Sequence, residues 1–204
     1  MRSLLLGTRN PGKLIEITSI LADSGWSFSS LEEFPNVGEA KENFTTFGEN
    51  AIAKAQFYAV ATGLCALADD SGLEVEALGG APGVFSARYA GSNATDADRR
   101  TLLLSELGKT GDTTRRARFV AVVAISKPCG EILNISEGTC SGTITCSPRG
   151  TGGFGYDPLF IPDGYEQTFA ELPDTIKNQI SHRARALLGT RTFLSQLDHP
   201  LPSS

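Results

Sequence analysis

Cysteine is scarce in this sequence, and long apolar runs are missing. The four cysteines among 204 residues form no C-x-x-C pair, and the residues after Met1 read as a short strand, too short for a secretory signal. We therefore expect free thiols in a reducing, cytoplasmic location. Because no apolar stretch approaches the roughly 20 residues that span a bilayer, we also expect no membrane contact.

An excess of basic residues is missing as well. Lys and Arg total 18 against 23 Asp and Glu, which leaves a formal net charge of −5. A dedicated nucleic-acid surface normally shows an excess of Lys and Arg, so we expect no nucleic-acid partner. A small anionic ligand is not excluded, because a few local cations and a metal ion can make a positive pocket.

The residues that are present describe an ordinary globular protein, with 40% hydrophobic and 20% charged residues. The length suits one substantial core, and we expect a single domain over residues 1–204. The apolar pattern predicts a mixed α/β protein with a long sheet that is antiparallel in its second half. The predicted elements are strands at 3–7, 26–28, 64–68, 119–125, 132–135 and 142–146, and helices after residue 13, at 46–62, at 95–107 and at 174–197, the last one broken near Ser181.

The stretch from Ala66 to Gly72 is the centre of the sequence. An apolar run leads directly into Asp69 and Asp70. We interpret the run as a buried strand that ends at the two aspartates, at the sheet edge where ligands bind in open α/β folds. Consecutive strand residues point to opposite faces, so only one carboxylate can face a given cleft. The alternative is a strand followed by an Asp-Ser-Gly turn without function.

The loop at 8–13, Thr-Arg-Asn-Pro-Gly-Lys, joins the first strand to the first helix. Amides at a helix N-terminus favour phosphate, and Lys13 would add a positive charge. The Walker A pattern is absent, so this is not a P-loop. The alternative is a plain turn with a solvated lysine. In the helix at 46–62, Thr46 and Glu49 predict a capping box, while Asn50 and Lys54 share one face.

A glycine-rich stretch at 150–158 brackets Phe154 with four glycines. Glycine allows a close approach of the backbone to a ligand, and an aromatic ring can stack on a planar base. The alternative is a flexible loop whose Phe packs locally. In the last helical segment, Lys177, His182 and Arg183 add candidate polar contacts, although a lone His more often has a structural role.

The same motifs form a joint pattern: TRNPGK at 8–13, FGENAIAKA at 47–55, ADDSGL at 68–73, GGAPGVFSARY at 79–89, GGFGYDP at 152–158 and ISHR at 180–183. In this order, over nearly the whole chain, they resemble the inosine triphosphate pyrophosphatase family, whose bacterial members are XTP/dITP diphosphatases. The resemblance implies an elongated α/β fold with a central mixed sheet flanked by helices, two lobes with an active-site cleft between them, and a homodimer. It also implies Mg²⁺-dependent hydrolysis of non-standard purine nucleoside triphosphates (dITP or ITP, and XTP) to the monophosphate plus pyrophosphate, which cleanses the nucleotide pool.

The resemblance also assigns roles to single residues. It implies that Asp70 is the catalytic carboxylate and, together with Glu42, a metal ligand. This chain has Lys41-Glu42 where bacterial relatives often have two adjacent acids. The residues implied to bind substrate are Thr8, Arg9, Asn10, Pro11, Gly12 and Lys13 in the first loop, Lys54, Ser71, and the base contacts Phe154, Gly155, Tyr156, Asp157, Lys177, His182 and Arg183.

The chemistry of these residue types agrees with the implied roles. Lysines and loop amides offset triphosphate charge, and Mg²⁺ prefers carboxylate and phosphate oxygens. Arg183 carries only donors, which suit the six-carbonyl of hypoxanthine and xanthine better than the amino group of adenine. Two alternatives stay open: a non-catalytic nucleotide-binding module, and a related pyrophosphatase that acts on other modified nucleotides.

Overall fold

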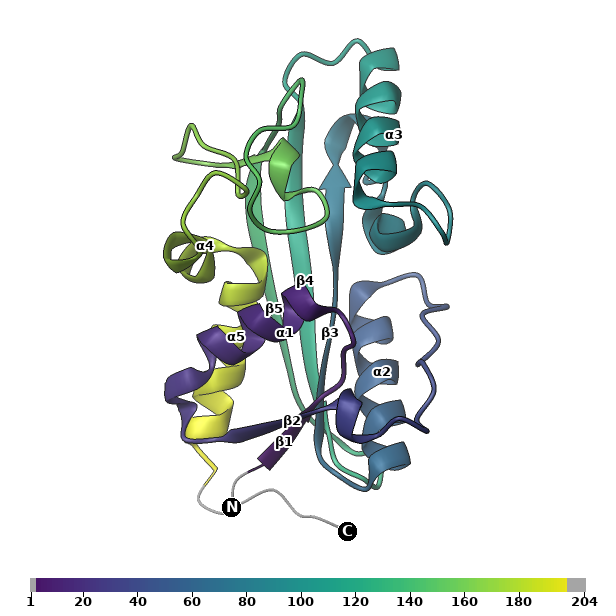
Figure 1. The fold of residues 1–204 in the computed structure, drawn as a ribbon, viewed down its shortest axis with the longest axis vertical. Helices are drawn as coiled ribbons and strands as arrows, with labels where there is room; N and C mark the ends of the chain where they lie inside the picture. The colour runs from purple at the N-terminus through teal and green to yellow at the C-terminus, as the bar shows by residue number, and fades with distance from the viewer. Residues whose placement is uncertain (1–2, 198–204) are drawn as a thin grey trace. The chain divides into compact units, whose positions relative to one another are not determined.

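The computed structural model describes residues 3–197, and within them six strands form one mixed sheet in the order β2-β1-β3-β4-β5-β6 (Figure 1). The strands are β1 Ser3–Leu6, β2 Ser27–Ser30, β3 Ala66–Val75, β4 Arg116–Ser126, β5 Ile132–Ile144 and β6 Phe160–Pro162. The helices are α1 Pro11–Ile20, α2 Phe47–Thr62, α3 Asp96–Lys109, α4 Asp174–Ile180 and α5 His182–Ser195. Short 3₁₀ helices cover Ala22–Ser24, Leu31–Glu33, Glu76–Leu78, Gly83–Arg88 and Asp157–Leu159.

Both parallel and antiparallel pairs occur in the sheet. β1 pairs in parallel with β2 and with β3, and β5 pairs antiparallel with β6. Helix α1 connects β1 to β2, and α2 connects β2 to β3, because a crossover is needed to bring the next strand back in the same direction. The predicted α/β fold with a central mixed sheet flanked by helices is confirmed.

The chain divides into two compact units. Within the described residues, unit 1 comprises 3–70, 121–138 and 183–197, and unit 2 comprises 71–120 and 139–182. β3, β4 and β5 therefore each contribute one segment to unit 1 and another to unit 2. The expectation of a single domain over the whole chain stays a prediction.

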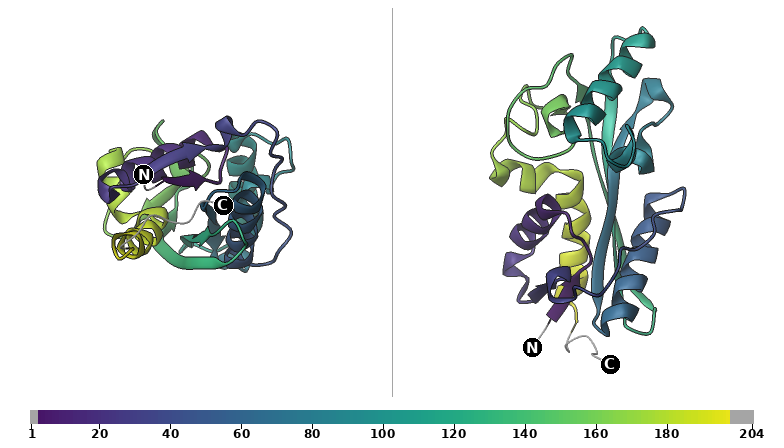
Figure 2. Two further views of the ribbon diagram at one scale, coloured as in Figure 1. Left: turned by 90° about the horizontal axis from the view of Figure 1, so that it is seen from below. Right: turned by 45° about the vertical axis from the view of Figure 1, so that its right-hand side comes forward.

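Unit 1 packs helices on both faces of its strands. Leu4 and Leu6 of β1 join a buried cluster with Ile17 of α1 and Leu187 of α5, whereas Leu5 joins another with residues of α2. This alternation follows from the period of two in a strand, and it places α1 and α5 on one face and α2 on the other (Figures 1 and 2). Each such leucine, fully buried, contributes about 1.5–3 kcal/mol.

Unit 2 has a core of its own. Leu73 and Val75 of β3 pack with Leu103 and Leu107 of α3 and with aromatic side chains from β4, β6 and the segment after β5. Phe119, Phe160 and Phe169 form an aromatic group with ring centroids 4.7 to 6.1 Å apart. Aromatic contacts of this kind add to the gain from apolar burial alone.

Two strand boundaries differ from those expected. The prediction that the central strand ends at the aspartates is wrong, because β3 continues through Asp69 and Asp70 to Val75. Leu73 and Val75 extend the buried face of the strand into unit 2, so the Asp-Ser-Gly turn does not form. The predicted strands at 132–135 and 142–146 are one long strand, β5.

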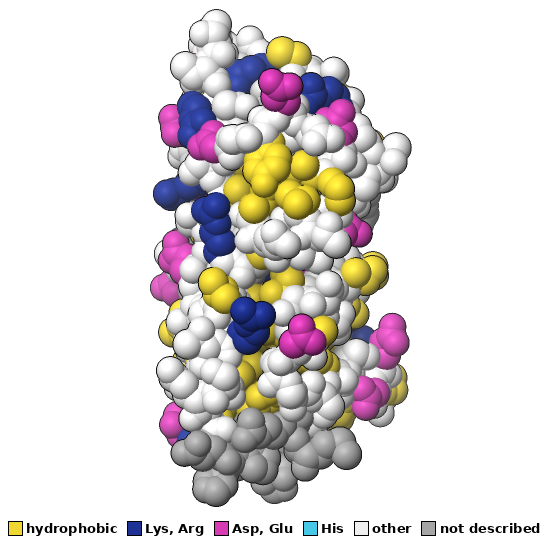
Figure 3. Space-filling model, turned by 90° about the vertical axis from the view of Figure 1, so that its left-hand side faces the viewer, with side chains coloured by type: hydrophobic (Ala, Val, Ile, Leu, Met, Phe, Trp, Pro, Cys, Tyr) yellow, Lys and Arg dark blue, Asp and Glu magenta, His cyan; other side chains and the backbone are white. Residues whose placement is uncertain are grey.

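The predicted break in the last helical segment is confirmed, because Ser181 has extended backbone. The predicted capping box at the start of α2 is confirmed only in its first half: the Thr46 hydroxyl accepts from the Glu49 amide, while the Glu49 carboxylate accepts from the Thr46 hydroxyl. All four cysteines are free thiols. None of the helices between residues 3 and 197 is long and apolar enough to cross a membrane. On the face shown in Figure 3, Lys and Arg side chains lie beside Asp and Glu side chains.

The β5–β6 pair makes a prediction about stability. A Cβ at Gly142 would collide with the Ile161 carbonyl and lie 2.7 Å from the Phe160 ring. We expect Gly142→Ala to lower the free energy of unfolding by about 1–3 kcal/mol through overpacking. Gly108, in α3 with open space around it, is the control: Gly108→Ala should stabilise by about 0.5–1 kcal/mol. Urea unfolding measures the change in the free energy of unfolding of both variants. A change of the same sign in both would contradict the prediction.

Candidate active site

The two aspartates at the centre of β3 point to opposite faces of the strand, as their adjacency predicts. Asp69 faces α1 and α5, and Asp70 faces α2, all within unit 1. Both are buried, with 2% and 6% of their surface exposed. Buried carboxylates are tolerated only when charges or hydrogen bonds compensate them, so the partners of each one define its role.

Asp69 lies in a largely buried ion network. Its Oδ2 is 3.0 Å from Lys13 Nζ, and it accepts hydrogen bonds from Nε and Nη2 of Arg183 at 3.2 and 3.1 Å. The remaining guanidinium nitrogen, Nη1, donates to Glu16 of α1. Burial alone would raise the pKa of Asp69, but the charges of Lys13 and Arg183 outweigh it and hold that pKa far below its ordinary value.

Asp70 lies beside a lysine from the other face. Lys54 Nζ donates to Asp70 Oδ1 at 2.9 Å and to Glu42 Oε1 at 2.5 Å. Burial favours the neutral amine, yet the surrounding carboxylates hold the pKa of Lys54 above its ordinary value. The predicted pair of acids, Asp70 and Glu42, is therefore brought together by one ammonium group.

Asn50 fixes the loop that carries Glu42. Its Oδ1 accepts from the Phe44 amide at 3.1 Å, and its Nδ2 donates to the Phe44 carbonyl at 3.3 Å. Asn50 is fully buried one helical turn before Lys54, so the same face of α2 holds both the loop and the cation. In the sequence, the i,i+4 spacing of Asn50 and Lys54 indicated that the two side chains share one face of the helix.

The second oxygen of Asp70 is buried and makes no hydrogen bond within residues 3–197. Burial raises the pKa of Asp70, with the charges of Lys54 and Lys13 acting in the opposite direction. A buried acceptor without a donor costs free energy, so this atom is suited to a ligand: a water, a cation or a proton. Among the described residues, no group of three or more His, Cys, Asp or Glu side chains could hold a metal ion by itself.

The first loop leads into α1 as predicted. Asn10 caps the helix by accepting from the Lys13 amide at 3.2 Å, and Thr8 Oγ1 accepts from the Asn10 amide at 3.2 Å. Arg9 Nη2 donates to the Val37 carbonyl at 2.7 Å, so this side chain ties the following segment to the loop. Pro11 and Gly12 form the first turn of α1.

The base-binding candidates that come from the glycine-rich stretch lie in unit 2. Asp157 Oδ2 accepts from the Phe154 amide at 2.8 Å and from Lys177 Nζ at 2.6 Å. The Lys177 ammonium also lies 5.0 Å from the centroid of the Phe154 ring. Gly153 has φ +66°, and a Cβ there would collide with the Asp157 carboxylate. The glycine, the aspartate and the lysine together hold the Phe154 ring in place.

The remaining predicted residues have partners that the sequence did not reveal. In unit 2, His182 stacks on Phe119 at 4.6 Å between centroids, and the Tyr156 hydroxyl donates to the Ser86 carbonyl at 3.0 Å. Ser71 lies half-buried in β3. In unit 1, Arg183 is 1% exposed and bonded to Asp69 and Glu16, which supports a role in holding these carboxylates.

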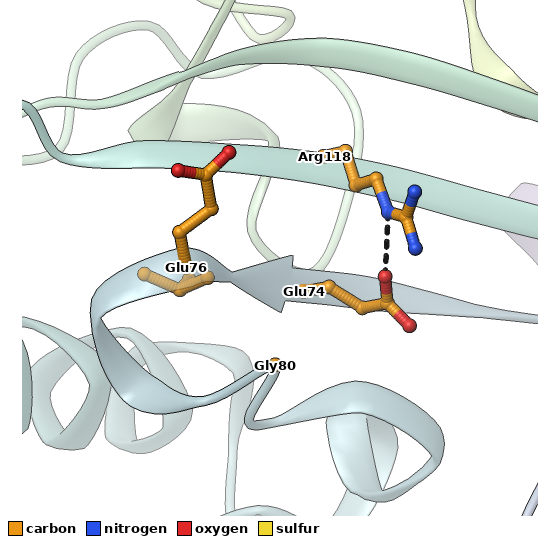
Figure 4. A pocket seen from close by; sticks show the side chains of 5 residues that line it. Glu74, Glu76, Gly80 and Arg118 are labelled. Atoms are coloured by element: carbon orange, nitrogen blue, oxygen red, sulfur yellow. Dashed lines mark hydrogen bonds and ion pairs between the residues drawn. The ribbon is translucent and has the colours of Figure 1, made fainter.

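A separate pocket of about 240 Å³ lies in unit 2 (Figure 4). It is lined by Glu74, Val75, Glu76, Gly80 and Arg118, and Arg118 Nε donates to Glu74 at 2.6 Å. These residues include none of those predicted for the site. The chemistry of the candidate site therefore depends on the buried charges around β3 and not on this pocket.

Comparison with known proteins agrees with the motifs. The model of the Ham1 family matches residues 4–193. The chain belongs to the Ham1 family. A dITP/XTP pyrophosphatase from Geobacter sulfurreducens is 51% identical, with 92% of this chain and 94% of that protein covered; one from Desulforamulus reducens is 48% identical, with 95% and 96% covered. A solved HAM1 protein from Coxiella burnetii superposes with a TM-score of 0.88 at 44% identity, over 97% of this chain and all of that one. The resemblance stated from the motifs is thereby confirmed.

The ion network of Asp69 makes a prediction about stability. Asp69→Asn would leave Lys13 and Arg183 buried with too little negative charge, so we expect a loss of about 3–5 kcal/mol at pH 7. Because the folded-state pKa lies below the unfolded value near 3.8, the stabilisation is present above that pH and is lost as the pH falls below it. The variant should therefore show a shallower decrease of stability below pH 4 than the wild type.

Asp163→Asn is the matched control, because Asp163 forms an exposed pair with Arg116, with 54% of its side chain accessible. Exposed pairs contribute little, so its unfolding curve should stay close to that of the wild type. Chemical denaturation from pH 3 to pH 7 compares the three proteins. Equal losses in both variants would contradict the buried-network explanation.

Proposed function

We propose that this chain hydrolyses non-standard purine nucleoside triphosphates, dITP or ITP and XTP, to the monophosphate and pyrophosphate. The observation that carries the proposal is the group Glu42–Lys54–Asp70, in which one buried ammonium holds two carboxylates and leaves Asp70 Oδ2 available. The names of the Geobacter and Desulforamulus relatives, dITP/XTP pyrophosphatases, support the same activity. A homodimeric state stays a prediction from the resemblance, and a cytoplasmic location stays a prediction from the cysteine usage.

Mg²⁺ is the proposed cofactor, and the donor set fits it. Mg²⁺ commonly binds through one or two carboxylates while substrate phosphates and waters complete its octahedron. Asp70 and Glu42 supply two carboxylates, and Oδ2 of Asp70 accepts no hydrogen bond within residues 3–197. When bound, the ion would neutralise charge on the triphosphate and polarise the phosphoryl oxygens.

The basic side chains around β3 would bind the phosphate chain. Lys13 lies at the start of α1, where helix amides favour an anion, and Lys54 lies beside Asp70. Each lysine side chain is already held by a carboxylate, so substrate binding does not incur the entropic cost of immobilising it. In the reaction, a water oxygen bonds to the α-phosphorus, and the bond from that phosphorus to the bridging oxygen breaks, which releases pyrophosphate.

Oδ2 of Asp70 has two lone pairs, so one would ligate the ion while the other would accept a hydrogen bond from the attacking water and orient it. Burial raises the pKa of Asp70, which favours acceptance of the proton that the water loses, whereas a bound Mg²⁺ would lower that pKa. The carboxylate would therefore mainly hold the ion and the water, with proton acceptance secondary. Lys54, bonded to Oδ1, fixes the orientation of the carboxylate and keeps it ionised before the proton moves. Asp69 has the opposite environment and would stay ionised throughout, which supports a structural role for it.

The glycine-rich stretch would bind the base. The Phe154 ring offers a face for stacking, which gives affinity for any purine. Selectivity would come from donors such as Lys177, because a donor pairs with the six-carbonyl of hypoxanthine and xanthine and leaves the six-amino group of adenine unpaired. An unpaired group in a buried site costs about 1–3 kcal/mol.

A substrate panel tests this function. Pyrophosphate release should be at least about tenfold more efficient, in kcat/KM, with dITP, ITP and XTP than with ATP, and it should require Mg²⁺. Coupled phosphate detection after inorganic pyrophosphatase measures it, with product identification by chromatography. Binding without turnover would favour the non-catalytic alternative, and preference for another modified nucleotide would favour a related pyrophosphatase.

Asp70→Asn tests the catalytic carboxylate. We expect kcat to fall at least about 100-fold, since the acceptor for the water proton and one metal ligand are lost. Two effects on stability oppose each other in this variant. The raised pKa means that the ionised Asp70 opposes folding at neutral pH, an effect that fades as the pH falls through the folded-state pKa, whereas Lys54 loses the carboxylate that contributes most to holding its own pKa up. Because Lys54 keeps Glu42 as a partner, the melting temperature should change little, in contrast to Asp69→Asn. Near-normal turnover in Asp70→Asn would contradict the assignment of Asp70 as the catalytic carboxylate.

A further inference from the structure

Helix α3 contacts the glycine-rich stretch through both backbone polar groups of one residue. The Gly155 amide donates to Asp96 Oδ2 at 2.7 Å, and the Gly155 carbonyl accepts from Arg100 Nη1 at 2.7 Å. Asp96 and Arg100 are spaced i,i+4, so they lie on one face of α3. None of the sequence motifs included these two side chains, and the proposed chemistry does not use them.

The two side chains are held for this contact. The start of α3 is capped by Thr95 and Asp98, which form a capping box, so Asp96 is not needed as a cap. Arg99 instead binds the other carboxylate oxygen of Asp96, and it is itself fixed by the carbonyls of Ala87 and Ala94 at 2.7 and 2.8 Å. Asp96 therefore presents Oδ2 to Gly155 from a fixed position.

Gly155 follows Phe154 directly and has φ +59°. On the other side, the Phe154 amide is bonded to Asp157, and Lys177 lies over the ring. The peptide before Phe154 and the peptide after it are thus both fixed by charged side chains. A charged partner strengthens a hydrogen bond to a backbone group, so both anchors resist reorientation of the ring.

We propose that Asp96 and Arg100 are positioning residues that hold the Phe154 ring in the orientation needed to stack on the purine base. The inference rests on the proposed function, because it takes Phe154 as the base contact. Asp96 and Arg100 act through the loop and touch neither the phosphates nor the reacting atoms. Their loss should therefore weaken binding of the base and leave the chemical step intact.

The experiment uses Arg100→Met and Asp96→Ala in the full chain, with ITP as substrate. We expect KM and the calorimetric Kd for ITP to rise about tenfold, as for a lost hydrogen bond with a charged partner, while kcat stays within about twofold. Competitive inhibition by inorganic tripolyphosphate, which has no base, should be unchanged. Arg100→Lys and Asp96→Asn keep a donor and an acceptor and should restore most of the affinity.

Two matched controls come from the same helix. Glu106 and Lys109 form an exposed ion pair on α3, and Glu106→Ala and Lys109→Met should leave KM and kcat unchanged. A double variant, Arg100→Met with Phe154→Ala, tests the mechanism. If Arg100 acts through the ring, the double variant binds ITP no more weakly than Phe154→Ala alone.

Several results would overturn the inference. The first is a double variant whose loss of ITP affinity equals the sum of the two single losses. The second is inhibition by tripolyphosphate that weakens as much as ITP binding does. The others are a fall in kcat at constant KM, and wild-type affinity for ITP in both Arg100→Met and Asp96→Ala. Failure of the proposed function looks different, because the wild type would then release no pyrophosphate from ITP. In that case the Kd values for ITP of the wild type and the variants still test the positioning role of Asp96 and Arg100. A wild type that does not bind ITP would contradict both the proposed function and the positioning role.

Discussion

Compensation of two adjacent buried carboxylates is the constraint on which unit 1 depends. A strand must send Asp69 and Asp70 to opposite faces, and neither charge can be buried alone. Lys13 and Arg183 compensate Asp69 on one face of the strand, and Lys54 compensates Asp70 on the other. Arg183 and Lys54 each bind a second carboxylate, and Lys13 lies at the start of a helix. The positions of α1, α2 and α5 around β3 are therefore determined by charge as well as by apolar packing.

The same pair shows how local environment separates two roles for one residue type. Asp69 has two cations and a strongly lowered pKa, so it is a fixed anion. Asp70 shares one cation with Glu42, has a raised pKa and keeps an oxygen without a donor. Because two cations balance its negative charge, Asp69 is a structural element. Asp70 shares a single cation with Glu42, so its remaining negative charge is suited to bind a cation or a proton.

Much of this arrangement could be predicted from the sequence, for identifiable reasons. Strand alternation placed the aspartates on opposite faces, Thr46 and the break at Ser181 were visible as local signals, and the motifs gave the family. The continuation of β3 was missed because Asp-Asp-Ser-Gly has the composition of a turn, and only long-range burial of Leu73 and Val75 overrides it. The contacts of Arg183, Asp96 and Arg100 could not be predicted, since they join residues 55 to 167 positions apart.

The position of Arg183 in the chain has a consequence for synthesis on the ribosome. Asp69 emerges early, whereas the arginine that neutralises it follows 114 residues later. During that interval the nascent chain can form β1, α1 and β3 locally, but the buried carboxylate lacks its second cation. The charge balance of Asp69 in unit 1 is therefore complete only after α5 has left the ribosome, and the long sequence separation makes this a slow, non-local contact to form.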